Sequence, residues 1–421
     1  MISFSEARSI WAKIGLLSFG GPAGQIALMH RELIDKRKLI DEKEFLSALN
    51  FCMLLPGPEA MQLATYIGWK LHGLKGGLTA GVLFILPGAI VLYGLSSIYV
   101  LFGSVPLVAN LFWGVKAAVL AIVLEALLRV AKRALKGPMD YAIAAAAFIS
   151  LFVFAIPFPL IVAAAAFIGW LMWQPLKAEA KTIHWPPFRQ TLKTLAIWLA
   201  LWLVPLAALN FLWAQSVYAL LGNFFSKLSV VTFGGAYAVL SYMGQDVVEA
   251  HHWLTTPQMM DGLGLAETTP GPLILVGQFV GFLAASSQGG GLLGGFIGGA
   301  IFLWMTFVPC FLWIFVGAPY LEYLQNQPRI ASALARVTAA VCGVILNLSV
   351  WFGLNFLFSH VVRLQGPLPM WWPDWHSFDV AAAALSALAG VALLRFHFGL
   401  AKTLALCAAL GIIWRTIVVP L

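Results

Sequence analysis

The stretch FCMLLPGPEAMQLA (51–64) places Pro-Gly-Pro in the middle of an apolar, helix-forming run. Each proline removes a backbone donor and clashes with the preceding turn, which costs about 3 kcal/mol inside a helix. A helix that only had to cross a bilayer would gain nothing from this break. The interruption therefore indicates that residues 56–58 have a role other than crossing the bilayer.

The composition around this stretch is that of a membrane protein. The chain has 421 residues, of which 61% are hydrophobic and 10% are charged, whereas soluble domains carry about 25% charged residues. We expect an all-α polytopic membrane protein. Short basic loops explain the net charge of +8 through the positive-inside rule, so we expect no nucleic-acid partner. The four cysteines are scattered in apolar segments without a CxxC pair, and we expect no metal centre and no cofactor.

The apolar pattern gives about 13 membrane segments, of which the first three are 9–29, 45–69 and 76–102. The stretch KAEAKTIHWPPFRQ (177–190) is charged, then contains Pro-Pro, and is typical of a linker. We therefore divide the chain into an N-terminal repeat (1–176), a linker with a connecting helix (177–212) and a C-terminal repeat (213–421).

The two halves show an internal duplication. TFGGAYAVLSYMGQDVV (232–248) aligns with SFGGPAGQIALMHRELI (18–34) at an offset of 214 residues, and at that offset PGP 56–58 falls on PGP 270–272. Two uncommon motifs at one internal distance predict a repeat. Six segments, one connecting segment and six more would place the second copy upside down. This is the inverted-topology repeat of many secondary transporters.

The segment 45–69 either spans the membrane or turns back at PGP. The flanking stretch 30–44 and the pair Lys70 and Lys75 are all basic. Cytoplasmic loops carry the excess of Lys and Arg, so this pattern favours a re-entrant segment. The same question applies to the corresponding segment 258–286.

The broken helices predict an anion site. Non-helical backbone is tolerated at membrane depth only where protein buries it or where it lines a polar cavity. A half-helix starting at a break has unpaired N–H groups and a partial positive charge, so it attracts anions without a charged side chain. We expect Pro22 to open one helix and Pro58 and Glu59 to lie in the first turn of another. Gly and Pro also pack and kink membrane helices without binding anything, but their repetition in both halves favours a midplane substrate site.

These motifs resemble a known family. SFGGPAGQIALMHRELID (18–35), the PGP-containing run 50–88, TFGGAYAVLSYMGQDVV and GLAETTPGPLILVGQFVGF (264–282) are similar to the chromate ion transporter family in its long two-domain form. The resemblance covers nearly the whole chain. It implies chromate efflux across a bacterial inner membrane, with sulfate as the close analogue and a proton or counter-anion as the coupling ion.

The resemblance also implies which residues bind the substrate. In the first half they are Gly20, Gly21, Pro22, Gln25, Pro56, Gly57, Pro58, Glu59 and Gln62. In the second half they are Gly234, Gly235, Tyr237, Glu267, Thr269, Pro270, Gly271, Pro272 and Gln278. The halves differ, because Ala236 replaces Pro22 and Leu273 replaces Glu59.

The residues themselves add three hypotheses. The glutamine amides and the hydroxyls of Thr268 and Thr269 could donate to a tetrahedral dianion, or could instead make ordinary interhelical bonds. Lys116 lies in an apolar segment, where a charge is a functional hypothesis by default unless it snorkels to the interface. A protonated Glu59 or Glu267 would couple proton movement to anion movement.

Other functions remain open on the sequence. Sulfate or another tetrahedral oxyanion is the first alternative to chromate, and a channel is a weaker one. An intramembrane enzyme is a remote alternative, since the chain has no HExxH, no GxSxG and no paired aspartates inside spans. We therefore expect a transporter and not an enzyme. A homodimer is compatible with the sequence, which does not fix the oligomeric state.

Overall fold

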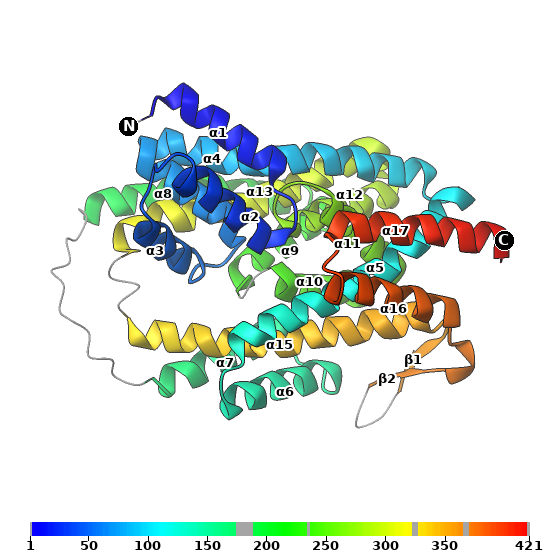
Figure 1. Cartoon of the computed structure of the whole chain (residues 1–421). Helices are drawn as coiled ribbons and strands as arrows, with labels where there is room; N and C mark the ends of the chain where they lie inside the picture. The colour runs from blue at the N-terminus through cyan, green and yellow to red at the C-terminus, as the bar shows by residue number, and fades with distance from the viewer. Residues whose placement is uncertain (1, 174–187, 234–235, 322–326, 365–369, 419–421) are drawn as a thin grey trace. The chain divides into compact units, whose positions relative to one another are not determined.

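The structure, a computed structural model, describes residues 2–173, 188–233, 236–321, 327–364 and 370–418 (Figure 1). The described residues are almost entirely helical, with one two-stranded antiparallel sheet in which Val361 pairs with Pro373. The predicted linker 177–190 lies outside the described residues up to position 187.

The elements follow the order of the two predicted repeats. In the first half they are α1 (Phe4–Leu17), α2 (Gly21–His30), η1 (Arg31–Asp35), α3 (Glu42–Cys52), α4 (Glu59–Phe102), α5 (Pro106–Ala134), α6 (Pro138–Phe152) and α7 (Phe158–Leu171), followed by the connecting helix α8 (Phe188–Leu212). The second half begins with α9 (Val217–Val231), α10 (Ala236–Gln245), η2 (Asp246–Ala250), α11 (Thr256–Thr268), η3 (Leu273–Leu275), α12 (Val276–Ala285), η4 (Ser286–Gly290), α13 (Gly291–Gly317) and η5 (Ala318–Tyr320). It ends with α15 (Pro328–Leu357), β1 (Val361–Arg363), β2 (Trp371–Pro373), η6 (Trp375–Ser377), α16 (Val380–Leu394), α17 (Leu400–Ile413) and η7 (Trp414–Val418).

Six of the described helical segments are long and apolar enough to cross a membrane. They are α4, α5, α8, Leu273–Tyr320, α15 and Leu400–Val418. A bilayer core needs about 20 apolar residues in a helix. The protein is therefore a polytopic helical membrane protein, as predicted.

Two predicted segments are not single helices. The segment 9–29 consists of α1 and α2, which are separated at FGG, and 45–69 consists of α3 and the first part of α4, which are separated at PGP. The helix α4 is itself broken, because Gly73 has φ 62° and ψ −153°. It therefore consists of one helix from 59 to 71 and another from 74 to 102.

The chain forms two compact units, and each unit takes segments from both predicted repeats. The first unit contains Met1–Gly94, Trp170–Val239 and Thr269–Leu334. The second contains Leu95–Gly169, Leu240–Thr268 and Ala335–Leu421. The compact units therefore do not coincide with the two halves of the sequence.

In the first unit, small residues allow helices to approach closely. The helix α13 packs against α8, α9 and α12. A Cβ atom on Gly298 of α13 would lie 2.1 Å from the carbonyl oxygen of Gly281 on α12. A Cβ atom on Gly15 of α1 would lie 2.0 Å from the carbonyl oxygen of Leu83 on α4. Such glycines are typical of contacts between membrane helices.

In the second unit, α5 is the central helix, since it packs against α11, α16 and α17. Gly114 of α5 meets α17, because its Cβ atom would lie 2.0 Å from the carbonyl oxygen of Cys407. Gly343 of α15 approaches the carbonyl oxygen of Ala144 on α6 in the same way.

Candidate functional site

The FGG break needs its two glycines. Gly20 and Gly21 have φ angles of 86° and 70°, a left-handed region that side chains other than glycine enter at a cost. Pro22 is the second residue of α2, where its missing N–H costs no helical bond. No atom of the described residues lies within 4 Å of a Cβ atom built on either glycine. The FGG break therefore has open space beside its backbone.

The PGP breaks have the same kind of backbone. Gly57 has φ 123° and Gly271 has φ 95°. The helix α4 begins at Glu59, and the carbonyl oxygen of Pro58 accepts a bond from the Gln62 nitrogen at 3.1 Å. The prediction that Pro58 lies in the first turn is therefore wrong by one residue, because this carbonyl makes Pro58 the residue that precedes the helix.

The first PGP is the tip of a helical hairpin. Glu44, in the first turn of α3, forms an ion pair with Lys70, near the end of the 59–71 helix. Phe51 and Tyr66, which lie closer to the tip, have ring centroids 6.1 Å apart. These two pairs require antiparallel helices. The chain therefore turns back at PGP. A re-entrant placement of 45–69 in the membrane stays a prediction, and so does that of 258–286, whose helices α11 and α12 belong to different units.

The first unit joins each PGP to the FGG region of the opposite half. The Gly57 nitrogen donates to the Thr232 carbonyl at 2.8 Å, and the Gly271 nitrogen donates to the Ser18 carbonyl at 2.8 Å. Gly57 and Gly271 correspond at the offset of 214 residues, and so do Ser18 and Thr232. Reciprocal contacts between equivalent residues are what a two-fold relation between the halves requires.

The hydroxyls beside the FGG motifs are also used alike in the two halves. The Ser18 Oγ donates to the Ile14 carbonyl at 2.6 Å, and the Thr232 Oγ1 donates to the Leu228 carbonyl at 2.5 Å. Both hydroxyls therefore close the last turn of the helix that precedes FGG.

The three predicted glutamines hold backbone carbonyls. Gln25 Nε2 donates to the Gly271 carbonyl at 2.6 Å and to the Ser18 carbonyl at 3.3 Å. Gln62 Nε2 donates to Pro56 at 2.7 Å, and Gln278 Nε2 donates to Ala89 on α4 at 2.9 Å. All three side chains are buried. Their observed bonds are therefore structural, and Gln25 in particular joins the FGG break of one half to the PGP break of the other.

The residues that precede the half-helices have no side chain that could cap the first backbone donors. Gly20 precedes α2, Pro58 precedes α4 and Pro272 precedes η3. None of these has a side-chain oxygen that could accept the N–H groups of the first turn, as Ser or Asp does at an ordinary helix start. Backbone donors at the breaks are thus suited to an anion.

The remaining predicted residues lie in different places. Tyr237 and Glu59 are half-buried in the first unit, and Thr269 is buried there at the start of its last segment. Glu267 is buried on α11 of the second unit. Thr268 is exposed, and its hydroxyl donates to the Leu265 carbonyl at 2.7 Å. Gly234 and Gly235 lie outside the described residues.

Lys116 forms a buried charge cluster in the second unit. Its Nζ lies 3.4 Å from Oδ1 of Asp261, and the Tyr99 hydroxyl donates to Oδ2 of Asp261 at 2.8 Å. The Lys116 side chain is 16% exposed and that of Asp261 is 5% exposed. Lys116 is therefore paired inside the protein and does not snorkel. Sequence reasoning missed Asp261, although an isolated aspartate in an apolar segment was a signal of it.

The chain matches a described family over most of its length. Residues 6–170 and 219–412 match the family described as chromate transporter. The chain is a member of the chromate transporter family.

Its relatives carry the same description. The chain is 27% identical over 414 residues to the probable chromate transport protein of Synechococcus elongatus, covering 92% of this chain and 95% of the relative. It is 30% identical over 340 residues to the chromate transport protein of Cupriavidus metallidurans, covering 79% and 78%. It is 31% identical over 348 residues to the chromate transport protein of Pseudomonas aeruginosa, covering 82% and 80%. No solved structure matches this member of the chromate transporter family significantly.

Proposed function

We propose that the protein exports chromate across a bacterial inner membrane and binds the oxyanion at the N-termini of its half-helices. Membership of the chromate transporter family supports the substrate class. The reciprocal bonds of Gly57 with Thr232 and of Gly271 with Ser18 carry the assignment of the site, because they bring the breaks of both halves into one unit.

The chemistry of the breaks suits a tetrahedral dianion. Such an ion accepts several hydrogen bonds at once, and the starts of α2, α4 and η3 supply backbone donors together with partial positive charge. Backbone donors bind an anion without a fixed cation, so a dianion can also leave. The open space beside Gly20 and Gly21 gives it access to the backbone.

The absence of a fixed cation from the proposed site has a consequence for coupling. A dianion that moves outward carries negative charge, so a membrane potential that is negative inside favours its export. Glu59 and Glu267 remain the residues at which we propose that a proton joins this movement. Sulfate is the competing substrate, because it is also a tetrahedral dianion.

The test is uptake of labelled chromate by inside-out membrane vesicles, with and without energisation, and with excess sulfate as competitor. We expect energy-dependent uptake that sulfate reduces. Uptake of sulfate but not of chromate would show that sulfate is the substrate, and it would leave the proposed site unchanged. No uptake of either anion, with intact protein in the membrane, would refute an oxyanion exporter.

A further inference from the structure

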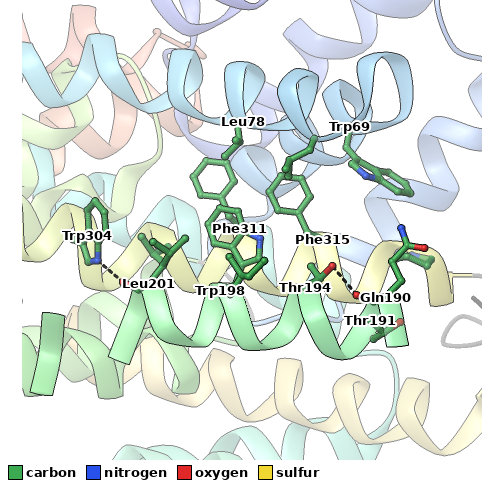
Figure 2. Close-up of a pocket in the computed structure, with 14 residues that line it drawn as sticks. Trp69, Leu78, Gln190, Thr191, Thr194, Trp198, Leu201, Trp304, Phe311 and Phe315 are labelled. Carbon is green, nitrogen blue, oxygen red and sulfur yellow. Dashed lines mark hydrogen bonds between the residues drawn. The ribbon is translucent and has the colours of Figure 1, made fainter. Parts of the chain in front are cut away.

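A groove of about 900 Å³ lies in the first unit between α8, α13 and α4. Figure 2 shows α4 above α8 and α13, with Leu78 and Trp69 of α4 on the side that faces the two lower helices. The groove follows α8 from Gln190 to Leu201. That distance is roughly 16 Å at 1.5 Å per helical residue.

The wall of the groove is aromatic and aliphatic. The ring of Trp198 on α8 lies 5.7 Å from Phe311 and 5.3 Å from Phe315, both on α13. The Trp304 indole nitrogen donates to the Leu201 carbonyl at 2.9 Å and fixes one end of the groove (Figure 2). None of the described residues that line the groove is charged, so an apolar chain fits it better than an ion.

The groove opens where lipid must lie. Only 11% of the apolar window of α8 is buried, and only Trp198 and Trp202 of this helix are buried side chains. A membrane helix with such exposure borders the hydrocarbon core. The hydrocarbon chains of lipids are therefore the apolar groups that have access to the groove.

One end of the groove is polar, and exposed basic residues adjoin its lining residues in the described part of the sequence. Gln190, Thr191 and Thr194 line this end, and the hydroxyls of Thr191 and Tyr320 lie 2.9 Å apart. Arg189 and Lys193 are exposed on the same two turns of α8. Lys75 is exposed beside the lining residue Leu74, and α8 contains no acidic residue. The positive charges are thus at one end, as an anionic headgroup requires.

We propose that this groove binds one acyl chain of an anionic phospholipid, with its phosphate at Arg189 and Lys193. The acyl chain lies along Ile197 and Leu201 toward Trp304. The site lies on the connecting helix α8, which belongs to neither predicted repeat, so the pseudo-symmetry of the breaks does not generate a second copy of it.

The test is native mass spectrometry of the purified protein with phosphatidylglycerol or phosphatidylcholine of identical acyl chains. We expect one tightly retained phosphatidylglycerol per chain and weaker retention of phosphatidylcholine. Leu201→Trp narrows the groove and should lower phosphatidylglycerol occupancy about tenfold, the effect of roughly two methylene groups of lost burial. Val204→Trp is the matched control, because Val204 is an exposed α8 residue outside the groove lining, and it should retain the lipid.

The headgroup is tested separately. Arg189→Gln with Lys193→Gln should lower phosphatidylglycerol binding roughly 25-fold, because each basic residue near an anionic membrane surface strengthens binding about fivefold. The double variant Arg395→Gln with Lys402→Gln removes two exposed charges elsewhere and should change nothing. If Leu201→Trp and Val204→Trp retained phosphatidylglycerol equally, the groove would not be the acyl-chain site. If the unaltered protein retained phosphatidylglycerol and phosphatidylcholine equally, the site would not select an anionic headgroup.

Discussion

The backbone nitrogen of Gly271 donates a 2.8 Å hydrogen bond to the carbonyl oxygen of Ser18, which lies at the end of α1. The equivalent bond joins Gly57 to Thr232. The break of each half is therefore stabilised by the backbone of the other half. A substitution at the PGP of one half should therefore alter the backbone at the FGG of the other half.

Gly21→Ala tests whether the substrate approaches the FGG backbone. Gly21 and Gly73 both have left-handed φ angles, 70° and 62°, and neither has an atom within 4 Å of a Cβ position. Gly73→Ala should lose at least as much stability as Gly21→Ala, about 1–3 kcal/mol, because the ψ of −153° at Gly73 belongs to a region that is almost exclusive to glycine. Only Gly21→Ala fills the proposed anion space, so only it should abolish chromate uptake in vesicles. Equal chromate uptake by the two variants would show that the substrate does not bind at the FGG break.

Gly57→Ala should be more harmful to folding. Its Cβ atom would lie 2.8 Å from the Sγ of Cys310 and 2.8 Å from Nε2 of Gln62, at φ 123°. Backbone strain and overpacking together predict a loss of about 2–5 kcal/mol. The thermal unfolding temperature in detergent measures it. Cys310→Ala should recover part of the loss in the double variant, whereas a purely additive effect would contradict the predicted clash.

Gln25→Met tests the bond between the breaks. Methionine has a similar length but no donor, so the buried Gly271 carbonyl loses its 2.6 Å bond, which costs about 1–3 kcal/mol. We expect lower thermal stability and loss of chromate uptake. Ser241→Ala removes a buried 2.9 Å bond to the Val344 carbonyl in the second unit and is the control for stability. If both variants lose stability and both transport chromate normally, the Gln25 bond has only a structural role.

The pair of Lys116 and Asp261 should behave non-additively. Asp261→Asn leaves the Lys116 ammonium buried without its anion, and removal of one partner of a buried pair costs about 3–5 kcal/mol. The double variant Lys116→Met with Asp261→Asn leaves no unpaired charge and should be more stable than Asp261→Asn alone. A double-mutant cycle on thermal stability measures this coupling. Additive losses would show that the two groups do not stabilise each other.

Glu32 should make stability depend on pH. Its carboxylate accepts bonds from Lys36, Arg37 and Lys13, and the bond from Lys36 is the main cause that lowers its pKa to about 2. A lowered pKa stabilises the folded state above the ordinary value near 4.5, and this stabilisation is lost as the pH falls toward 2. The unfolding temperatures of the protein and of Glu32→Gln should differ most above pH 5 and converge on acidification. A difference in unfolding temperature that stays constant down to about pH 3 would contradict this role of Glu32.

The breaks could be predicted from sequence because Gly and Pro act locally. FGG and PGP interrupt helices wherever the rest of the chain lies, so α1, α2, α3 and the 59–71 helix end or begin close to the predicted positions. The hairpin at the first PGP was also predictable, since the charges of Lys70 and Lys75 constrain the side on which its ends lie. The break at Gly73 lies between the predicted segments 45–69 and 76–102, because Lys70 and Lys75 interrupt the apolar run there.

The contacts across the halves were not predictable. The Gly271 nitrogen and the Ser18 carbonyl belong to backbone groups that every residue has, so no side-chain pattern marks them. The sequence left two roles open for the glutamine amides, which were binding of the substrate and hydrogen bonds between helices. Only the structure shows which bonds Gln25 makes. Asp261 and Lys116 lie on α11 and α5, and their pairing depends on tertiary packing that hydropathy does not report.

The joins between the breaks have an evolutionary consequence. After a gene duplication, a contact made by side chains ties two copies together residue by residue, whereas a main-chain contact tolerates substitution on both sides. Pro22 is aligned with Ala236 and Glu59 is aligned with Leu273. The two main-chain hydrogen bonds between the breaks nevertheless have the same length of 2.8 Å. Each copy was thus free to diverge and acquire its own side-chain chemistry while the shared scaffold stayed in place.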